Sequence, residues 1–477
     1  MNPDVVVVGA GAAGLAAAVS LAEAGLACHV VEQNDRPGGT TAHAVGSICV
    51  CLPPPDGDDS IEDFLADTAR FLPADAAHLV PADLRHLLAR TSGETLGWLR
   101  ALGVPLTGPY PEHPHRRPRL YATAPDGRSF IWWLLRRAHQ LGVTITCGAR
   151  VTRLLRHGAR VAGVRAGGVD LRGRVATVLA CGDFAANDDL KARYLTPAAA
   201  TSPAVNPTSR GDGLALGRSV GAAWRNMGTA FAPQLRFVAR TGPPADEWSP
   251  ALFTAGQAAG RVIPGPAGGG ADEVRASGWA AMPRAYMAPA AEDAALILDT
   301  GELIRVPGAV DRVAATASRT AYLLLDSRWL PGGEYPDRRI SSAPTMGFAR
   351  LADYRAARPD LVRDARDVEA VAALVGVPAE RLAGHLAGGP SWKPPYVLVG
   401  PARPVVTVTE GSLAVDDHLR VLSGDGTPIP GLFAAGAAGQ GGLLLLGHGL
   451  HLTWALTSGR AAAHAIAARA AGEGGTA

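Results

Sequence analysis

The sequence predicts an α/β protein in which a parallel sheet, built from both ends of the chain, is interrupted by a β-meander and by an inserted α+β segment. Three observations support this fold class. An apolar strand, a glycine-rich turn and a helix open the chain; short strands divided by glycines run from about residue 151 to residue 171; and a second apolar strand ending in glycine precedes a long C-terminal helix. Because 477 residues exceed one ordinary core, two domains are expected, three at most.

The opening segment has the pattern of a βαβ unit. Val5 to Val8 is a continuous β-branched run, as in a buried parallel strand. The turn Gly9-Ala10-Gly11-Ala12-Ala13-Gly14 leads into a helix that is rich in Ala and Leu and ends near Ala24. A second strand, Cys28 to Val31, ends at Glu32. Together these elements indicate a Rossmann-like nucleotide-binding start.

Each glycine of this turn has a separate task. Gly9 permits the tight turn, Gly11 lets the backbone approach a pyrophosphate, and Gly14 lets the helix pack closely on the strand. The helix N-terminus offers free N–H groups and a positive dipole end to the phosphates. The Glu32 carboxylate can accept the ribose hydroxyls of either NAD or FAD.

The turn after Glu32 distinguishes between the two dinucleotides. Arg36-Pro37-Gly38-Gly39-Thr40-Thr41-Ala42 contains a Gly-Gly-Thr sequence, which is typical of two-dinucleotide-binding flavoproteins. Small residues there let the backbone and the threonine hydroxyls meet the pyrophosphate and ribityl chain of FAD. The chain has one glycine triad of this kind, so a second site for NADPH is not expected. FAD is therefore the predicted cofactor.

Further elements are expected along the chain from periodicity and turn residues. In the first half, helices are expected within 60–103 and over 126–141, strands over 143–146 and 175–181, and a β-meander over 151–155, 160–165 and 169–171. Residues 239–292, rich in Pro, Gly and Ala, predict an irregular cap. In the second half, a helical pair is expected over 368–386, strands over 396–399, 405–408, 419–422 and 429–436, and a long helix over 451–470.

The position of the last strand and helix makes the nucleotide-binding domain discontinuous. Residues 1–230 and 401–477 are expected to form the FAD-binding domain. Residues 231–400 are expected to form an inserted α+β capping domain that holds the substrate.

Composition excludes several classes of function. A formal net charge of +2 without a dense basic run gives no electrostatic reason to bind nucleic acid or an anionic membrane. Five irregularly spaced cysteines predict neither a disulfide framework nor a metal site, and buried thiols are expected. No run of 18 apolar residues predicts a membrane span, and no signal peptide precedes the first strand, so a cytoplasmic protein is expected.

Several blocks of the chain resemble the superfamily of fumarate reductases, succinate dehydrogenase flavoproteins and 3-ketosteroid dehydrogenases. Val5 to Thr41 is similar to the N-terminal FAD block of these enzymes. Val178 to Asn187 resembles their strand that ends in Gly-Gly-Phe-x-x-Asn, with Asp183 in place of a glycine. Gly211-Asp212-Gly213 resembles an internal block, and Thr409 to Gly436 resembles the C-terminal block.

The resemblance implies a two-segment FAD domain, a cap over the isoalloxazine ring, and hydride transfer between flavin N5 and a carbon with proton transfer at the adjacent carbon. It predicts an FAD-dependent dehydrogenase or reductase that acts on a CH–CH group of a small organic substrate and exchanges electrons with an external acceptor or donor. The expected cofactor-binding residues are Gly9, Gly11, Ala12, Ala13, Gly14, Glu32, Gln33, Arg36, Gly39, Thr40, Thr41, Ala42, Gly46, Val151, Cys181, Gly182, Asn187, Asp212, Gly436 and Gly447.

Alternative functions stay open at this point. An FAD-dependent oxidase of an amine or hydroxy acid and a flavin-binding redox protein without substrate turnover share the same cofactor pattern. A flavin monooxygenase is disfavoured because Ala437 follows Gly436 where that class has an aspartate. Covalent attachment of FAD through His43 is a further alternative, although His43 lies closer to Gly46 than the linking histidine of the resembling families does.

The substrate half of the family pattern is altered. Where dicarboxylate-reducing members carry histidines, this chain has Ala232-Pro233-Gln234 and Thr407-Val408-Thr409, so fumarate and succinate are not expected as substrates. The resembling cap turn makes Arg312, eleven residues after Gly301, a candidate proton shuttle, with a surface arginine as the alternative interpretation.

The segment before the final helix contains the remaining candidate catalytic residues. It reads Gly447-His448-Gly449-Leu450-His451. The resemblance implies that the start of this helix faces the pyrimidine ring of the flavin and stabilises its reduced anion. His448 and His451 are therefore candidates for contact with substrate or flavin.

Overall fold

The N-terminal βαβ segment forms the centre of a parallel sheet. Strand β1 (Val5–Val8) pairs in parallel with β2 (Cys28–Val31) on one side and with β10 (Ala176–Leu179) on the other. In the part of the chain that the computed structural model describes, six strands form this sheet in the order β24-β25-β10-β1-β2-β6. Continuous apolar runs such as Val5–Val8 suit this position, because both faces of the sheet are buried there.

The structure describes residues 2–74, 76, 79–123, 126–237, 286–287, 294–305, 309–336, 339–343, 347–387 and 392–474. Contacts divide the chain into two compact units. The first unit comprises Met1–Thr196, Ala204–Phe231 and Thr407–Ala477, and the second comprises Pro197–Pro203 and Ala232–Val406. The division into functional domains at residues 230 and 400 stays a prediction.

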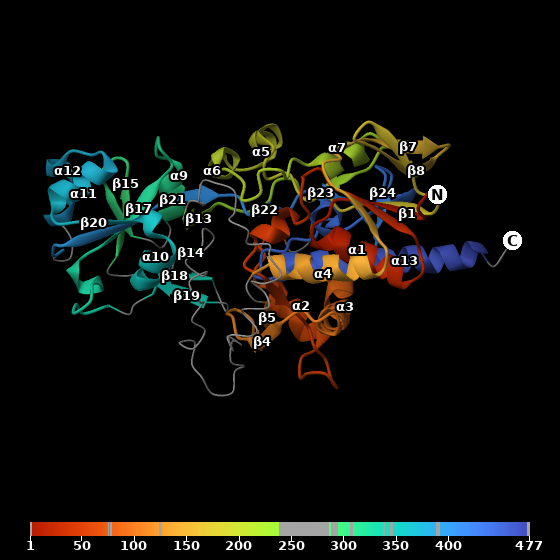
Figure 1. The fold of residues 1–477 in the computed structure, drawn as a ribbon, viewed down its shortest axis with the longest axis horizontal. Coiled ribbons are helices and arrows are strands. Elements are labelled where there is room, and N and C mark those ends of the chain that lie inside the picture. The colour runs from red at the N-terminus through yellow and green to blue at the C-terminus, as the bar shows by residue number, and fades with distance from the viewer. Residues whose placement is uncertain are drawn as a thin grey trace. The chain divides into compact units, whose positions relative to one another are not determined.

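One helix of the first unit packs on the parallel sheet and is flanked by two others (Figure 1). Helix α1 (Ala12–Glu23) packs against α4 (Arg128–Gln140) and against α13 (Leu450–Gly474), which also contacts α3 (Ala82–Ala101). The approach of α13 to α1 is close, since a Cβ on Gly459 would lie 2.3 Å from the carbonyl oxygen of Ala13. The C-terminal helix therefore covers the start of the chain.

Smaller sheets and helices complete the first unit. The remaining strands of this sheet are β6 (Thr144–Thr146) and β25 (Pro428–Ala434), which are parallel to their neighbours β2 and β10, and β24 (Arg420–Leu422), which pairs antiparallel with β25 at the edge. The β-meander consists of β7 (Val151–His157), β8 (Arg160–Ala166) and β9 (Val169–Arg172), and a separate antiparallel sheet consists of β3 (Ser47–Cys49), β5 (Leu120–Thr123) and β4 (Leu106–Tyr110). Two short pairs join β11 (Trp224–Arg225) to β23 (Ser412–Leu413) and β12 (Ala230–Phe231) to β22 (Val408–Thr409). The other helices are η1 (Gly39–His43), α2 (Ile61–Ala69), α5 (Asp188–Tyr194), α7 (Asp212–Arg218) and η5 (Gly436–Gly439).

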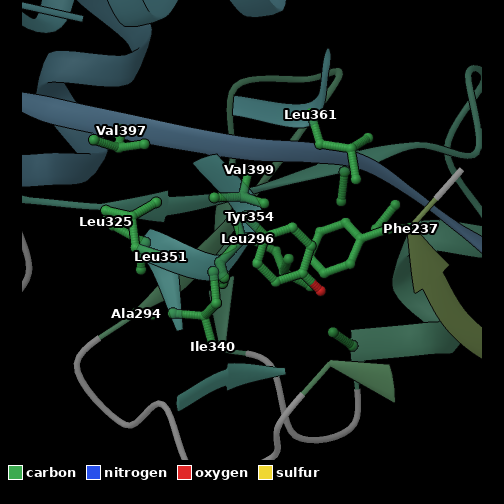
Figure 2. Close-up of a cluster of buried hydrophobic side chains, with 14 of the residues drawn as sticks. Phe237, Ala294, Leu296, Leu325, Ile340, Leu351, Tyr354, Leu361, Val397 and Val399 are labelled. Atoms are coloured by element: carbon green, nitrogen blue, oxygen red, sulfur yellow. The ribbon is translucent and has the colours of Figure 1, made fainter. Parts of the chain in front are cut away.

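The second unit is built around an antiparallel sheet with its own apolar core. Figure 2 shows the rings of Phe237 and Tyr354 side by side in that core, where they make an edge-on contact with centroids 5.1 Å apart, among buried aliphatic side chains such as Leu296 and Val399. The described strands are β13 (Gln234–Phe237), β14 (Tyr286–Met287), β15 (Ala295–Leu298), β16 (Leu303–Arg305), β17 (Ala321–Leu325), β18 (Arg339–Ala343), β19 (Gly347–Arg350), β20 (Val362–Ala365) and β21 (Tyr396–Val405). The described helices are α6 (Pro197–Thr201), α9 (Ala309–Ala314), η3 (Ser327–Trp329), α10 (Leu351–Ala357), η4 (Pro359–Leu361), α11 (Val368–Val375) and α12 (Ala379–Ala387).

The structure confirms the predicted fold class and changes one of its details. The two separate strands expected over 396–399 and 405–408 are wrong, because residues 396–405 form the single strand β21. Pro401 and Pro404 are tolerated inside it because the ladder to β17 shifts register between Ala321 and Leu323 and ends at Ala402. Beyond that point β21 pairs only with β13, at the edge position where a missing N–H donor is accepted. The irregular cap expected over 239–292 lies almost wholly outside the described residues.

Candidate functional site

The glycine-rich loop after β1 is packed too tightly to admit side chains at two positions. A Cβ on Gly9, whose φ is +103°, would lie 2.5 Å from the carbonyl oxygen of Ala180, and a Cβ on Gly14 would lie 1.9 Å from the carbonyl oxygen of Gly9. Gly11 differs, because the nearest atom to its Cβ would be 3.8 Å away. Helix α1 begins directly after Gly11, which supplies no side-chain cap, so the start of the helix offers backbone N–H groups that a phosphate can accept, although the N–H of Ala12 also donates to Thr41.

Glu32 is fixed beside this loop by backbone donors. Its two carboxylate oxygens accept hydrogen bonds from the N–H groups of Ala10, at 2.8 Å, and Asn34, at 2.9 Å. The carboxylate is buried, yet it borders a pocket. That pocket is lined by Val8, Gly9, Val31, Glu32, Gln33, Ala149, Arg150, Val151, Cys181, Asp212 and Leu216. The structure thus brings together Glu32 and five other predicted cofactor residues from separate parts of the sequence, namely Gly9, Gln33, Val151, Cys181 and Asp212.

The Gly-Gly-Thr turn lies directly on the glycine-rich loop. The N–H of Gly38 donates to the carbonyl of Ala10 at 3.0 Å, and the N–H of Ala12 donates to Thr41 Oγ1 at 3.4 Å. Thr40 Oγ1 accepts a hydrogen bond from Asn206 Nδ2 at 3.1 Å. Asn206 is not among the predicted cofactor residues, although the polar residues Asn206, Thr208 and Ser209 just before the Gly-Asp-Gly block could have indicated it. The turn is therefore anchored on both sides.

Some predicted cofactor residues have structural roles that the structure makes visible. The side chain of Asn187 caps α5 by accepting from the N–H of Leu190 and also donates to the carbonyl of Arg210. Gly182 has a φ of +78°, and Gly46 lies against residues 126–127, with its Cβ position 2.8 Å from the N atom of Gly127. Arg36 is exposed. The contact of each of these residues with FAD stays a prediction.

Asp183, which stands in place of a family glycine, joins two of the family blocks. Its carboxylate accepts hydrogen bonds from the N–H of Thr409, at 2.6 Å, and from Thr409 Oγ1, at 3.3 Å. Burial raises the pKa of Asp183, and these hydrogen bonds act in the opposite direction. Thr409 Oγ1 also lies 3.2 Å from the N–H of Phe184, from which it accepts a hydrogen bond. The Thr409 side chain is thus hydrogen-bonded to the segment that follows β10.

The C-terminal segment 436–449 lies between the glycine-rich loop and strand β3. A Cβ on Gly436 would be 2.7 Å from Ala13 Cβ, and a Cβ on Gly449 would be 2.8 Å from the N atom of Cys49. Gly447 packs in the same way against Phe71 and Leu450. This segment therefore continues the surface that starts at the nucleotide-binding loop. It includes His448, and His451 follows two residues after its end.

His451 belongs to a buried network centred on Glu410. His451 Nε2 donates to Glu410 Oε1 at 2.7 Å. Glu410 Oε2 accepts from the N–H of Leu445, at 3.0 Å, and from the side-chain amide of Gln440. Glu410 and Gln440 are both fully buried. With both oxygens occupied, Glu410 ties segment 436–449 to the first turn of α13.

His448 makes a different pair, with Glu112 in the loop between β4 and β5. His448 Nδ1 lies 3.1 Å from Glu112 Oε1, and the two side chains are 15% and 17% exposed. His448 Nε2 and Glu112 Oε2 are both buried, and neither has a hydrogen-bond partner among the described residues. Sequence reasoning missed Glu112, because 336 positions separate it from His448.

The loop that carries Glu112 is held by a buried ion cluster. Arg119 is 1% exposed and binds Asp59 through two hydrogen bonds of 2.6 and 2.7 Å. It also binds Asp67, which receives further hydrogen bonds from the backbone and side chain of Arg116. Burial alone would raise the pKa of Asp67, but the hydrogen bonds from Arg116 and Arg119 outweigh it and lower the pKa to about 2.

This pKa predicts a loss of stability in acid. The folded-state pKa of Asp67 lies below the ordinary value of 3.8, so its contribution is complete above about pH 4 and disappears as the pH falls toward 2. The expected contribution is about 2 kcal/mol of unfolding free energy. Urea unfolding of the wild type and of Asp67→Asn at a series of acidic pH values measures it. A difference between the two proteins that stays constant across this range would contradict the prediction.

Cys49 and His115 remain uncharged beside the cluster. Arg119 donates to His115 Nδ1 at 3.1 Å, so Nε2 carries the proton and points at Cys49 Sγ, 3.6 Å away. Burial, followed by the charge of Arg119, lowers the pKa of His115, and burial raises the pKa of the Cys49 thiol. The expectation that all five cysteines are buried needs correction, because Cys147 and Cys181 are partly exposed.

Arg312 lies in the second unit, on the short helix α9. Its guanidinium pairs with Glu302, and its side chain is 56% exposed. A solvated guanidinium holds its proton too firmly to act as an acid. This position favours the surface-arginine interpretation, and the role of Arg312 as a proton shuttle stays a prediction.

The residues of the first unit fit an FAD molecule. The uncapped start of α1, the space above Gly11, the pocket beside Glu32 and the adjoining threonine turn offer the donors and acceptors that a pyrophosphate and a ribose require. A family model described as an FAD binding domain matches residues 4–242 and 352–447. The chain therefore belongs to this family of FAD-binding proteins, and FAD is its cofactor.

Solved structures share the fold. A flavocytochrome c3 fumarate reductase in its open conformation has a TM-score of 0.73 at 20% identity, over 98% of this chain and 78% of that chain. The 3-ketosteroid Δ1-dehydrogenase from Sterolibacterium denitrificans has a TM-score of 0.68 at 18% identity, over 98% of this chain and 99% of that chain. The 3-ketosteroid-Δ4-(5α)-dehydrogenase from Rhodococcus jostii RHA1 has a TM-score of 0.59 at 22% identity, over 98% and 96%. No curated protein matches the chain.

The family model confirms the predicted cofactor, and the solved structures show that the chain has the fold of the predicted superfamily. In the described part of the chain, no helix is long and apolar enough to cross a membrane.

Proposed function

We propose that the protein is an FAD-dependent oxidoreductase that acts on a carbon–carbon bond of a small organic substrate, with His448 as the proton-carrying residue. When bound, FAD supplies the hydride acceptor or donor at its N5 atom. The chain supplies the proton site, and the observation that supports His448 is its buried Nε2 atom, which has no partner among the described residues. Similar folds in a fumarate reductase and two ketosteroid dehydrogenases support a CH–CH reaction.

Dicarboxylates are poor candidates for the substrate. The resembling dicarboxylate enzymes use a histidine near the position of Thr407-Val408-Thr409, and here Thr409 is fully buried and hydrogen-bonded to Asp183 and Phe184. A neutral hydroxyl engaged in this way cannot replace a cationic ligand for a carboxylate. The proposed substrate therefore carries a carbonyl or hydroxyl group rather than two carboxylates, and an external acceptor or donor completes the electron exchange.

A spectroscopic screen of the FAD-loaded protein tests this proposal. Under anaerobic conditions, saturated ketones, including 3-ketosteroids, are expected to bleach the visible absorbance of the flavin, or their unsaturated counterparts to restore it after chemical reduction. Fumarate and succinate are expected to do neither. Bleaching by amines or 2-hydroxy acids alone would contradict the proposal in favour of an oxidase. If the flavin is reduced or oxidised by an artificial electron carrier but by no organic substrate, the proposal is rejected in favour of a redox protein without substrate turnover.

The role of His448 has a matched control. His448→Gln is expected to lower the rate of flavin reduction by the identified substrate by about 10²-fold or more, the usual effect of losing a general acid or base. FAD content is expected to stay at the wild-type level. His418→Gln removes a histidine with a 63% exposed side chain and is expected to leave the rate unchanged. Equal rates for His448→Gln and wild type would remove His448 from the chemistry.

A further inference from the structure

We propose that Glu112 is the positioning residue of the active site: its carboxylate fixes the tautomer and orientation of His448. This inference rests on the proposed function for its consequence in catalysis, but the pair itself can be tested without a substrate. Glu112 comes from the loop between β4 and β5, a part of the chain that neither the family pattern nor the sequence analysis singled out.

The geometry of the pair selects the tautomer. An ionised carboxylate only accepts hydrogen bonds, so the 3.1 Å contact with Glu112 Oε1 requires the proton on His448 Nδ1. In the neutral ring Nε2 then carries the free lone pair, and in the charged ring Nε2 carries the mobile proton. Glu112 thereby assigns the exchangeable proton of His448 to a single atom, Nε2. A carboxylate that orients a histidine through its other nitrogen is a recurrent device in enzymes.

Two buried atoms of the pair can each take a further hydrogen-bond partner. His448 Nε2 and Glu112 Oε2 are both buried without a partner among the described residues. A buried polar atom without a hydrogen bond is unfavourable, so a ligand group that completes the hydrogen bond is favoured to bind there. The neighbouring pair shows the contrast, since both oxygens of Glu410 are satisfied by His451, Gln440 and Leu445. The ligand that would complete the His448–Glu112 pair carries a carbonyl or a hydroxyl group, whose oxygen forms a hydrogen bond with His448 Nε2.

Both members of the pair stand on firm supports. The Glu112 loop is closed by a hydrogen bond from the N–H of His115 to the Glu112 carbonyl, at 2.9 Å, and by one from the N–H of Arg119 to the Tyr110 carbonyl, at 3.2 Å. The buried ion pairs of Arg119 fix its far end. On the other side, Gly449 packs directly against strand β3, which limits the movement of His448. Supports of this kind are what a positioned catalytic side chain requires.

The test reads the tautomer directly. The holoprotein is labelled with ¹⁵N in its imidazole rings, and long-range proton–nitrogen correlations are recorded above the pH at which an ordinary histidine loses its proton. His448→Gln identifies the signals of His448 by their disappearance. In wild type we expect the Nδ1–H tautomer for this residue. In Glu112→Ala we expect a switch to the Nε2–H tautomer, which is the default of an unconstrained imidazole. An unchanged tautomer in Glu112→Ala would overturn the proposal.

Matched variants separate positioning from folding. Glu112→Gln keeps the size of the side chain, and it is expected to weaken the preference for Nδ1–H while retaining wild-type FAD content; it decides the question if the alanine variant does not fold. Asp417→Asn removes an exposed carboxylate 3.9 Å from His418 and is expected to leave the signals of His448 in place. A Glu112→Gln spectrum identical to that of wild type, together with an unfolded Glu112→Ala, would count against the proposal.

Kinetics distinguish this inference from the proposed function. With a substrate from the screen, Glu112→Ala is expected to lower kcat by about 10- to 100-fold, the usual effect of losing an orienting partner, with little change in KM. If Glu112→Ala switches the tautomer of His448 but the screen finds no organic substrate, the positioning role is supported and the proposed function is rejected. Loss of turnover in His448→Gln with full turnover in Glu112→Ala would sustain the proposed function and reject the positioning role.

Discussion

Replacement of Gly14 by alanine is expected to abolish FAD binding. The added Cβ would lie 1.9 Å from the carbonyl oxygen of Gly9, so either α1 must move away from β1 or the glycine-rich loop must change its path. Either movement displaces the N–H groups that would hold the pyrophosphate. Overpacking of this kind costs about 1–3 kcal/mol or more of unfolding free energy. Flavin absorbance per protein and a urea unfolding curve measure the two effects.

Gly97→Ala is the matched control for this substitution. Gly97 is an exposed position inside α3, and its added Cβ would meet no described atom within 4 Å. Alanine is the better helix former by about 1 kcal/mol, so this variant is expected to be slightly more stable and fully loaded with FAD. A Gly14→Ala protein that binds a full complement of FAD would show that α1 approaches β1 less closely than described.

Removal of the Arg119 charge is expected to destabilise the first unit severely. Arg119→Met keeps an unbranched side chain of similar reach but leaves Asp59 and Asp67 buried without the guanidinium that neutralises them. Breaking a buried ion pair from one side costs about 3–5 kcal/mol, because a buried charge remains without compensation. Urea unfolding followed by circular dichroism measures the loss of unfolding free energy. Adding Asp59→Asn and Asp67→Asn to the Arg119→Met protein is expected to recover part of that loss.

The control for Arg119 is its neighbour Arg117. Arg117 pairs with Asp58 at 2.9 Å, but the two side chains are 39% and 89% exposed. Exposed pairs contribute about 0–1 kcal/mol, so Arg117→Met is expected to change the unfolding free energy by no more than that. If both arginine variants lost the same small amount, the charges of Asp59 and Asp67 would have to be compensated in some other way.

Local sequence patterns were sufficient to predict the FAD half of the molecule. The run Val5–Val8, the glycine triad and Glu32 each act on neighbours within about 30 positions, and the structure places them as the βαβ pattern requires. The C-terminal strand β25 and helix α13 were also predictable, because an apolar run ending in glycine and a long Ala-rich segment carry their own periodicity.

The partners of the candidate catalytic residues could not be predicted in the same way. Glu112 meets His448 across 336 positions and Glu410 meets His451 across 41, and no periodicity links such residues. Single acidic residues in loops resemble ordinary solvated charges until the fold brings a partner to them. The same holds for Asp183, whose importance lies in its contact with Thr409 rather than in its own segment. The two prolines in β21 misled the prediction because a register shift, which sequence does not show, accommodates them.

The close packing of Gly436 on Ala13 and of Gly459 on the Ala13 carbonyl has a consequence for biosynthesis. The ribosome makes the glycine-rich loop first and the segment that packs against it, from Gly436 on, last. The two are separated by roughly 420 residues, which take about 20 to 85 s to translate. During that interval the nascent βαβ unit exposes the face of α1 that α13 later covers. The predicted FAD site is therefore complete only when nearly the whole chain has been synthesised.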